Sequence, residues 1–270
     1  MDWETILLQK EEKIATITLN RPERRNAINR QMIQELIMAL EEVARDEEIR
    51  VVMINGAGKA FCAGADLDLM TGGKEEGTLS EQSVEELRRS FIFQAAKKLI
   101  LGLRELEKPT LAVVNGPCVG AGFDLALACD IRLGSEDALF MCGFVKIGLF
   151  PGFGATWFYP RLMGIGKALE LLYTGDQLRA EEALRLGVLN KVIPLAELKK
   201  EALFLAQKIA DGPPIALRLM KAQVYAGLNL DLEMALTNAA MCEAITLASQ
   251  DHKEGVTALR EKRTPDFKGL

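Results

Sequence analysis

Hydrophobic and polar residues follow two different patterns along this chain, and the change between them divides it in two. Up to about residue 195, short β-branched runs alternate with segments whose apolar residues recur every three or four positions, which predicts strands followed by helices. Beyond this point the strand signals stop, and amphipathic helical patterns remain at residues 197–210, 215–226 and 232–248. The sequence therefore predicts an α/β body over residues 1–195 and a helical region over residues 196–270.

Several elements of the α/β body have clear boundaries. Residues 4–10 and 14–20 predict an antiparallel hairpin, and Asn29 is suited to cap a helix whose apolar stripe begins at Met32. Further strands are predicted at residues 51–54, 110–114, 130–133 and 139–141, and further helices near residues 66–70, at 84–106 and after Asp124. The polar, Gly-containing stretch at residues 71–83 is expected to form a mobile loop.

Two segments repeat one pattern: VVMINGAGKAFCAGAD at residues 51–66 and LAVVNGPCVGAGFD at residues 111–124. Each passes from an apolar strand through Asn-Gly into a Gly-rich turn and ends on an acidic residue where a helical pattern begins. Such turns bring backbone N–H groups close to a ligand, and the start of the following helix adds attraction for negative charge. We therefore predict that the two turns hold one oxyanion.

Charge and composition narrow the class of partner. The chain has 270 residues, and 33 Lys and Arg against 38 Asp and Glu give a formal net charge of -5, which argues against nucleic acid. The N-terminus lacks the pattern of a secretory signal, and no segment has the roughly 18 apolar residues needed to span a bilayer. We expect a cytoplasmic protein without a membrane partner.

The residue inventory excludes several chemistries. The single histidine, His252, cannot build a Ser-His-Asp triad or a histidine-rich metal site, and the five cysteines contain no C-x-x-C pair, so no metal site is predicted. No phosphate-binding GxxxxGK[ST] motif occurs, and the Gly120 and Gly122 pair matches a dinucleotide fingerprint only in part. The predicted chemistry rests on backbone donors and carboxylates.

The motifs of the two Gly-rich turns and several other segments resemble those of a known family. The stretches AFCAGAD at residues 60–66 and NGPCVGAGFDL at residues 115–125 resemble the two oxyanion-hole segments of the crotonase, or enoyl-CoA hydratase/isomerase, superfamily. Further landmarks follow in the same order: LNRPERRNA at 19–27, ACDIR at 128–132, GLFPG at 148–152 and the end of the chain from Asp251. The resemblance covers nearly the whole sequence.

The resemblance implies a fold, an assembly and a substrate class. The fold is an α/β spiral of repeated ββα units with a C-terminal helical trimerisation region, giving a homotrimer or a hexamer built as a dimer of trimers. The substrate is an acyl-CoA thioester, so coenzyme A enters as part of the substrate and no separate cofactor is expected.

The resemblance also assigns roles to individual residues. The thioester oxygen is expected between the backbone N–H groups of Ala65 and Ala121, with Asp124 as general acid/base at a position where hydratases usually carry Glu. Substrate contacts are expected from the backbone of Ala63 and Asp66, from the turn residues Gly120 and Gly122, and from Phe144 at the acyl end. At the CoA phosphates, contacts are expected from Arg24, Arg25, Lys262 and Lys268. The two lysines come from the tail of this subunit or of a neighbour.

Two departures from the family pattern leave the reaction open. The second catalytic Glu of hydratases is replaced by Phe144, and the Asp that related isomerases use is replaced by Gly152. Asp124 alone can still support hydration through one water, so an enoyl-CoA hydratase-like enzyme is the leading hypothesis. A double-bond isomerase is the main alternative, because a 1,3-proton shift needs only one proton-carrying group. A non-catalytic acyl-CoA-binding protein is the third hypothesis.

Overall fold

The structure is a computed structural model that describes residues 3–66 and 91–270. The loop predicted at residues 71–83 lies outside the described residues, as do nearly all of the short helix predicted near residues 66–70 and the beginning of the helix predicted at 84–106.

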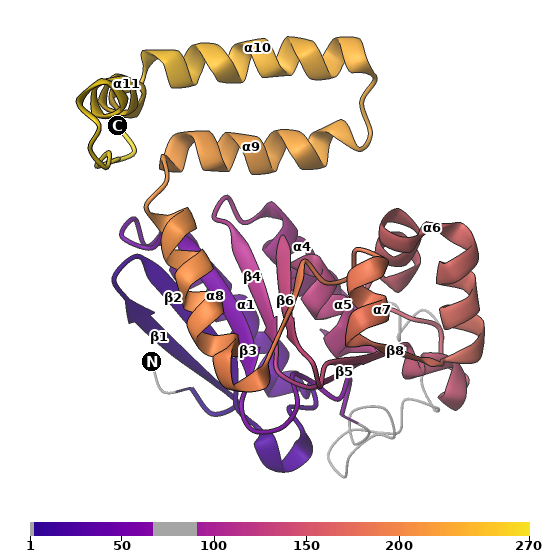
Figure 1. The fold of residues 1–270 in the computed structure, drawn as a ribbon. Coiled ribbons are helices and arrows are strands. Elements are labelled where there is room, and N and C mark those ends of the chain that lie inside the picture. The colour runs from indigo at the N-terminus through magenta and orange to yellow at the C-terminus, as the bar shows by residue number, and fades with distance from the viewer. Residues whose placement is uncertain (1–2, 67–90) are drawn as a thin grey trace.

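A six-stranded sheet forms the centre of the fold, with the strand order β1-β2-β3-β4-β6-β9 (Figure 1). Its strands are β1 (Ile6–Glu11), β2 (Ile14–Leu19), β3 (Val51–Gly56), β4 (Thr110–Val114), β6 (Ile131–Ser135) and β9 (Lys191–Ile193). The β1–β2 hairpin is antiparallel as predicted, and every other pairing in this sheet is parallel. Since β3 and β4 are parallel neighbours, the two Gly-rich turns that follow them start from the same edge of the sheet.

A second sheet of three short strands carries the continuation of these turns. It contains β5 (Pro117–Val119), β7 (Leu139–Met141) and β8 (Gln177–Arg179), with β5 parallel and β8 antiparallel to β7. Of these only β7 was predicted from the sequence, and β9 was missed as well. A three-residue strand is too short to display a period of two, so its pairing partners decide its conformation.

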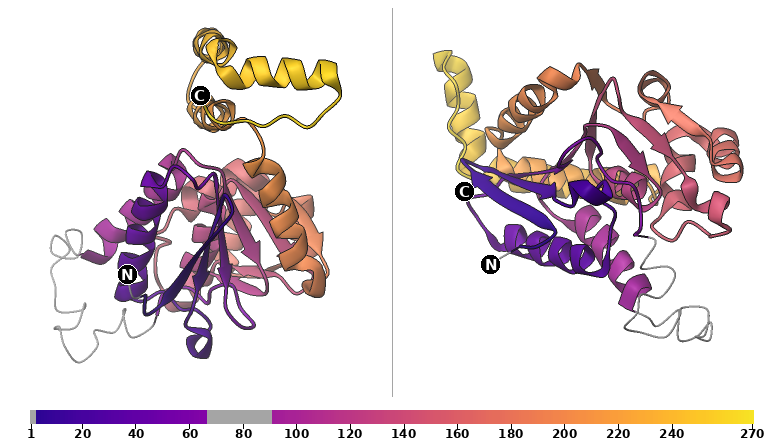
Figure 2. Two further views of the ribbon diagram at one scale, coloured as in Figure 1. Left: turned by 90° about the vertical axis from the view of Figure 1, so that its left-hand side faces the viewer. Right: turned by 90° about the horizontal axis from the view of Figure 1, so that it is seen from below.

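Helices cover the two faces of the main sheet differently, as Figure 2 shows in its left panel. One face carries α1 (Arg30–Arg45), α4 (Phe91–Glu105) and α5 (Ala121–Ala128), and the other carries α8 (Leu195–Ala210). The side chain of Asn29 accepts the N–H of Met32, which confirms the predicted cap of α1. Because Leu198 and the alanines that follow it on α8 are buried against the sheet, the separate helical layer begins only after this helix.

The remaining helices complete the fold. The short helix η1 (Pro22–Arg24) follows the hairpin, η3 (Gly143–Ile147) follows β7, and α6 (Ala155–Thr174) and α7 (Ala180–Arg185) pack at one end of the molecule. The helices α9 (Pro214–Gly227), α10 (Leu232–Ala248) and α11 (Gln250–Glu261) form a layer beyond the sheet (Figure 1).

A partly buried polar cluster anchors α9 to the body. Lys221 forms an ion pair of 2.9 Å with Asp130 at the start of β6, and the hydroxyl of Tyr225 donates to the same carboxylate at 2.5 Å. The guanidinium of Arg104 lies 3.4 Å from the centre of the Tyr225 ring. This cluster holds the helical layer at a fixed position on the amino-terminal side of the sheet.

Replacing Lys221 by Met is expected to lower the free energy of unfolding by about 3 kcal/mol, because it leaves the carboxylate of Asp130 in a poorly hydrated site without its cation. Urea unfolding followed by circular dichroism measures the loss. The control is Lys98→Met, which removes the exposed ion pair with Glu41 and should cost about 0.5 kcal/mol or less. Equal losses in the two variants would contradict the anchoring role of Lys221.

Candidate active site

The first Gly-rich turn leaves one backbone donor without a partner. Ile28 and Ala65 form an isolated parallel bridge in which the Ile28 N–H donates to Gly64 O at 2.7 Å and the Asp66 N–H donates to Ile28 O at 2.9 Å. In this arrangement the N–H of Ala65 points away from Ile28. It donates no hydrogen bond to any residue that the structure describes.

The second turn leaves a matching donor. Val119 donates to Cys62 O and Gly120 donates to Met141 O, both at 2.8 Å, and α5 then begins at Ala121. The first N–H groups of a helix have no acceptor within the helix. Within the described part of the chain the N–H of Ala121 likewise donates to no other group.

The backbone directly before each donor has a conformation that favours glycine. Gly64 has φ +101° and Gly120 has φ +51°, so each turn places a glycine with positive φ immediately before the alanine. This conformation orients the peptide group that carries the following N–H. Ala121 itself does not have positive φ, so its Cβ causes no backbone strain.

Other glycines allow the two turns to touch. A parallel bridge joins Cys62 to Cys118, and a Cβ on Gly122 would lie 2.5 Å from the Cβ of Cys62. A Cβ on Gly64 would lie 3.0 Å from the carbonyl oxygen of Val119 and 3.8 Å from the nitrogen of Ala121. The two donor segments thus lie in direct contact. Gly122 packs against Cys62, and its predicted contact with substrate stays a prediction.

Asp124 lies one helical turn after Ala121 and is completely buried. Neither of its carboxyl oxygens has a hydrogen-bond partner among the described residues. Burial raises the pKa of this carboxyl from 3.8 to about 8, although the N–H of Ala155 and the hydroxyl of Tyr159 face it and lower the pKa in part. At pH 7 the carboxyl group is therefore mainly protonated and can donate a proton.

Phe144, the residue that the resemblance puts in place of a second acid, lies beside the second turn. Its buried ring contacts the second turn, since its nearest carbon lies 3.5 Å from the position of a Cβ on Gly120. The groups that shift the pKa of Asp124 include no second carboxyl group within the described part of the chain. The structure therefore brings Ala65, Ala121, Asp124 and Phe144 together.

Ala63, Asp66, Arg24 and Arg25, which are expected to contact the CoA part of the substrate, also lie together. The N–H of Ala63 donates to the carbonyl of Arg25 at 2.9 Å, which places this exposed arginine next to the first turn. The exposed Arg24 lies in η1, directly before Arg25. The Asp66 carboxylate forms an ion pair of 2.8 Å with Arg21. Sequence reasoning missed the role of Arg21 in holding this loop, because no local spacing pairs two residues 45 positions apart.

The lysines of the tail lie elsewhere in the same chain. Arg50, directly before β3, donates to the carbonyl of Phe267 at 2.9 Å and so holds the tail at the amino end of this strand. Ala63 follows the carboxyl end of β3, about 17 Å away along six residues of strand. Lys262 and Lys268 are exposed, and a single chain does not bring them to Arg25. Their predicted contact with CoA now requires the tail of a neighbouring subunit.

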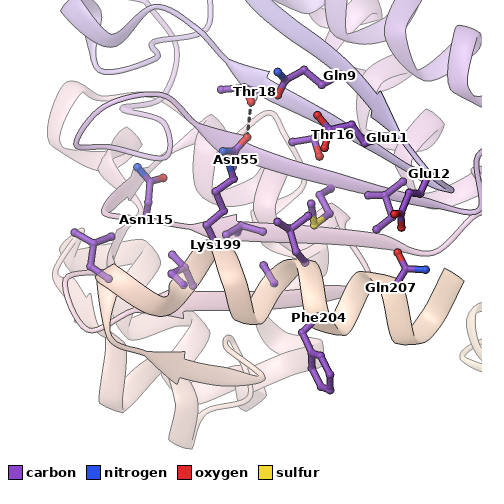
Figure 3. Close-up of a pocket in the computed structure, with 17 residues that line it drawn as sticks. Gln9, Glu11, Glu12, Thr16, Thr18, Asn55, Asn115, Lys199, Phe204 and Gln207 are labelled. Carbon is purple, nitrogen blue, oxygen red and sulfur yellow. Dashed lines mark hydrogen bonds between the residues drawn. The ribbon is translucent and has the colours of Figure 1, made fainter. Parts of the chain in front are cut away.

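The asparagines of the two Asn-Gly pairs lie at a different part of the surface. Asn55 and Asn115 line a groove of about 630 Å³ between α8 and the opposite face of the sheet (Figure 3). Asn55 accepts a hydrogen bond of 2.7 Å from the hydroxyl of Thr18 there. None of the residues predicted for the site lines this groove, so it is separate from the donors and Asp124.

The residues that the structure describes contain no cluster of three or more His, Cys, Asp or Glu side chains that could hold a metal ion. None of their helices has the length and apolar character required to cross a bilayer.

The high pKa of Asp124 predicts how stability depends on pH. An unfolded Asp ionises near pH 4, whereas the folded carboxyl stays protonated until about pH 8, so the free energy of unfolding should fall between these values by up to about 1.4 kcal/mol per pH unit. Asp124→Asn should remove this contribution. Chemical denaturation at several pH values measures it. An unchanged pH dependence in Asp124→Asn would contradict a protonated Asp124.

Comparisons with known proteins identify the family of the chain. The family described as enoyl-CoA hydratase/isomerase matches residues 9–270. The chain is 37% identical over 268 residues to a crotonyl-CoA hydratase of Syntrophomonas wolfei, covering 99% of both chains. It is 36% identical over 266 residues to a 1,2-epoxyphenylacetyl-CoA isomerase of Escherichia coli, covering 98% of this chain and 99% of the relative.

Among solved structures, the crystal structure of an enoyl-CoA hydratase from Bacillus anthracis superposes with a TM-score of 0.91 at 32% identity, covering 99% of this chain and 100% of the other. This agreement confirms the crotonase fold that the sequence predicted. The chain belongs to the enoyl-CoA hydratase/isomerase family of the crotonase superfamily, whose members act on CoA thioesters.

Proposed function

We propose that the protein hydrates a 2-enoyl-CoA thioester, with the N–H groups of Ala65 and Ala121 binding the thioester oxygen and Asp124 transferring protons. The observation that carries this proposal is the placement of two unpaired backbone donors on touching turns, one helical turn from a buried carboxyl group without a partner. Buried polar groups are normally paired, so these unpaired groups are suited to receive a ligand.

The two donors lower the energy of the enolate. When a nucleophile adds to the β-carbon of a 2-enoyl thioester, negative charge develops on the thioester oxygen. In this proposal the two N–H groups, which follow Gly64 and Gly120 on touching turns, bind the oxygen together and stabilise its charge without reorganising, by several kcal/mol.

Asp124 can perform both proton transfers, one after the other, because its carboxyl group has no hydrogen-bond partner among the described residues. The carboxyl proton moves to the α-carbon as the oxygen of water bonds to the β-carbon, and the carboxylate that remains then takes a proton from this oxygen. The carboxyl ends as protonated as it began, so no second acid is needed. The protonated form expected at neutral pH is the active form for this reaction.

A double-bond isomerase is the second candidate, favoured by the presence of Phe144 where a second acid would stand. A 1,3-proton shift uses one carboxylate that removes a proton from one carbon and returns it to another. The relatives include proteins named as hydratases and one named as an isomerase, so their names support both reactions.

The helical layer supports assembly into a trimer or a dimer of trimers. Helices α9 and α10 contain no buried residue, although α10 is apolar on all sides. Val224, Leu232 and Met241 are 66%, 74% and 66% exposed, which is unusual for an isolated soluble chain. A neighbouring subunit that covers these helices would also bring its tail, with Lys262 and Lys268, toward the CoA end of this site.

Asp124→Asn is expected to lower kcat at least about 100-fold, because the amide cannot transfer the proton. The assay incubates crotonyl-CoA and 3-enoyl-CoA esters in heavy-oxygen water and measures product mass. Hydration adds labelled oxygen, whereas isomerisation adds none. The control is Asp137→Asn, which changes an exposed carboxyl of the same kind. Full activity in Asp124→Asn would contradict its role, and no labelled product from any ester would rule out hydration.

The pH dependence of kcat/KM also distinguishes hydration from isomerisation. Hydration through protonated Asp124 predicts that kcat/KM falls as pH rises through about 8, whereas proton abstraction by ionised Asp124 predicts that it rises over this range.

Leu236→Glu, at a 60% exposed position of α10, is expected to dissociate the assembly, because it would bury a charge in the interface. Size-exclusion chromatography with light scattering measures the mass. The control Lys253→Glu changes the charge of an exposed residue on α11. A wild-type protein that is monomeric at micromolar concentration would contradict the proposed assembly.

A further inference from the structure

One buried hydroxyl group next to the site has no partner. Within the described residues, the buried side-chain atoms that lack a hydrogen bond are Asn115 Oδ1, both carboxyl oxygens of Asp124 and the hydroxyl of Tyr159. A buried hydroxyl without a partner lowers stability because it gives up its hydrogen bonds to water, so its presence requires an explanation. Three of these four atoms belong to two side chains that face each other.

Packing fixes the ring of Tyr159 beside Asp124. Tyr159 lies on α6, one turn after Ala155, and is completely buried. Its ring contacts that of Phe123, the residue before Asp124, with ring centres 4.8 Å apart, and Phe123 contacts Phe140 at the same distance. Because three packed rings cannot move independently, the hydroxyl is held toward the carboxyl group.

The other titratable groups around this pair remain neutral. Asp124 acts on the thiols of Cys118, on β5, and Cys142, before η3, and both thiols act on Tyr159; burial is the main cause that raises the pKa of each thiol. Burial also raises the pKa of the Tyr159 hydroxyl well above 10, so it keeps its proton. The groups that shift the pKa of Asp124 include no Lys or Arg among the described residues. The hydroxyl is thus the side-chain donor that faces this carboxyl.

We propose that Tyr159 is a positioning residue for Asp124: its hydroxyl donates a hydrogen bond to one carboxylate oxygen while Asp124 is without its proton, and so directs the other oxygen to the substrate. This inference rests on the proposed role of Asp124 in proton transfer. The O–H bond of Tyr159 is not broken, so the proton balance of the reaction is unchanged.

The proposal explains how one short acid can work alone. With Phe144 at the second acid position, the apolar surroundings of Asp124 strongly oppose its charged form. A hydrogen bond to the carboxylate favours that form when it is needed. Tyr159 thus provides, from α6, the polar contact that the Phe144 position lacks.

The test compares Tyr159→Phe with the wild-type protein without using turnover alone. Infrared difference spectroscopy against Asp124→Asn isolates the carboxyl band of Asp124, and its titration in the free protein gives the pKa directly. Tyr159→Phe should raise this pKa by about one pH unit, because the charged form loses a donor. The variant should also lower kcat about tenfold and change KM less than twofold, because Tyr159 does not touch the substrate.

Two further variants separate this effect from a loss of packing. Tyr173→Phe removes the hydroxyl of a 71% exposed tyrosine on the same helix and should change neither the pKa nor kcat. A 3-fluorotyrosine at position 159 keeps the ring and makes the hydroxyl a stronger donor, so it should lower the pKa of Asp124.

The outcomes distinguish the two proposals. An unchanged Asp124 titration in Tyr159→Phe, together with an inactive Asp124→Asn, would overturn the role of Tyr159 alone. Full activity in Asp124→Asn would overturn the proposed function, whatever the titration shows.

Discussion

The contact between two Gly-rich turns is the constraint on which the rest of the site depends. Parallel strands β3 and β4 start both turns at one edge of the sheet, and the Cys62–Cys118 bridge then draws them together. That approach is possible only because Gly122 has no side chain, since a Cβ there would lie 2.5 Å from Cys62. The two unpaired N–H groups are a consequence of this backbone geometry, so the donors do not depend on which side chains occupy positions 65 and 121.

The same packing that forms the donors also determines the chemistry of the acid. Asp124 follows Ala121 by one helical turn, and this position lies in the core of the molecule, next to the packed rings of Phe123, Phe140 and Tyr159. Burial without a partner cation raises its pKa to about 8 and turns an ordinary carboxylate into a proton donor. The proposed proton transfer by a single carboxyl group therefore depends on surroundings that control the protonation of that group.

Apolar burial holds α8 on the sheet, but it does not hold the helices α9 and α10 of the helical layer. Helix α8 buries Leu198, Ala202 and Ala206 against the sheet, whereas α9 and α10 bury none of their residues in the chain itself. The Asp130–Lys221–Tyr225 cluster holds α9 in place despite this exposure. The layer is thus positioned by polar contacts with its own body, and this chain leaves the apolar surface of α9 and α10 uncovered.

Sequence by itself determined the features that short segments encode. The β1–β2 hairpin, the Asn29 cap, the positions of several strands along the chain and the two Gly-rich turns could all be predicted, because local periodicity and glycine positions specify them. The family resemblance, which the comparisons confirm, came from the same motifs in the same order. The three-residue strands β5, β8 and β9 were missed, because their conformation comes from pairing.

Only the tertiary structure decided what surrounds each candidate residue. The structure buries Asp124 and places Tyr159, 35 positions later, beside it. It also pairs Arg21 with Asp66, 45 positions apart, and no local pattern records such contacts. The tail lysines were assigned by resemblance, and the Arg50 contact with Phe267 showed that one chain holds them far from Arg25. A local sequence pattern identifies a candidate residue and its element. The protonation of that residue and the groups it can contact depend on which distant segments pack around it.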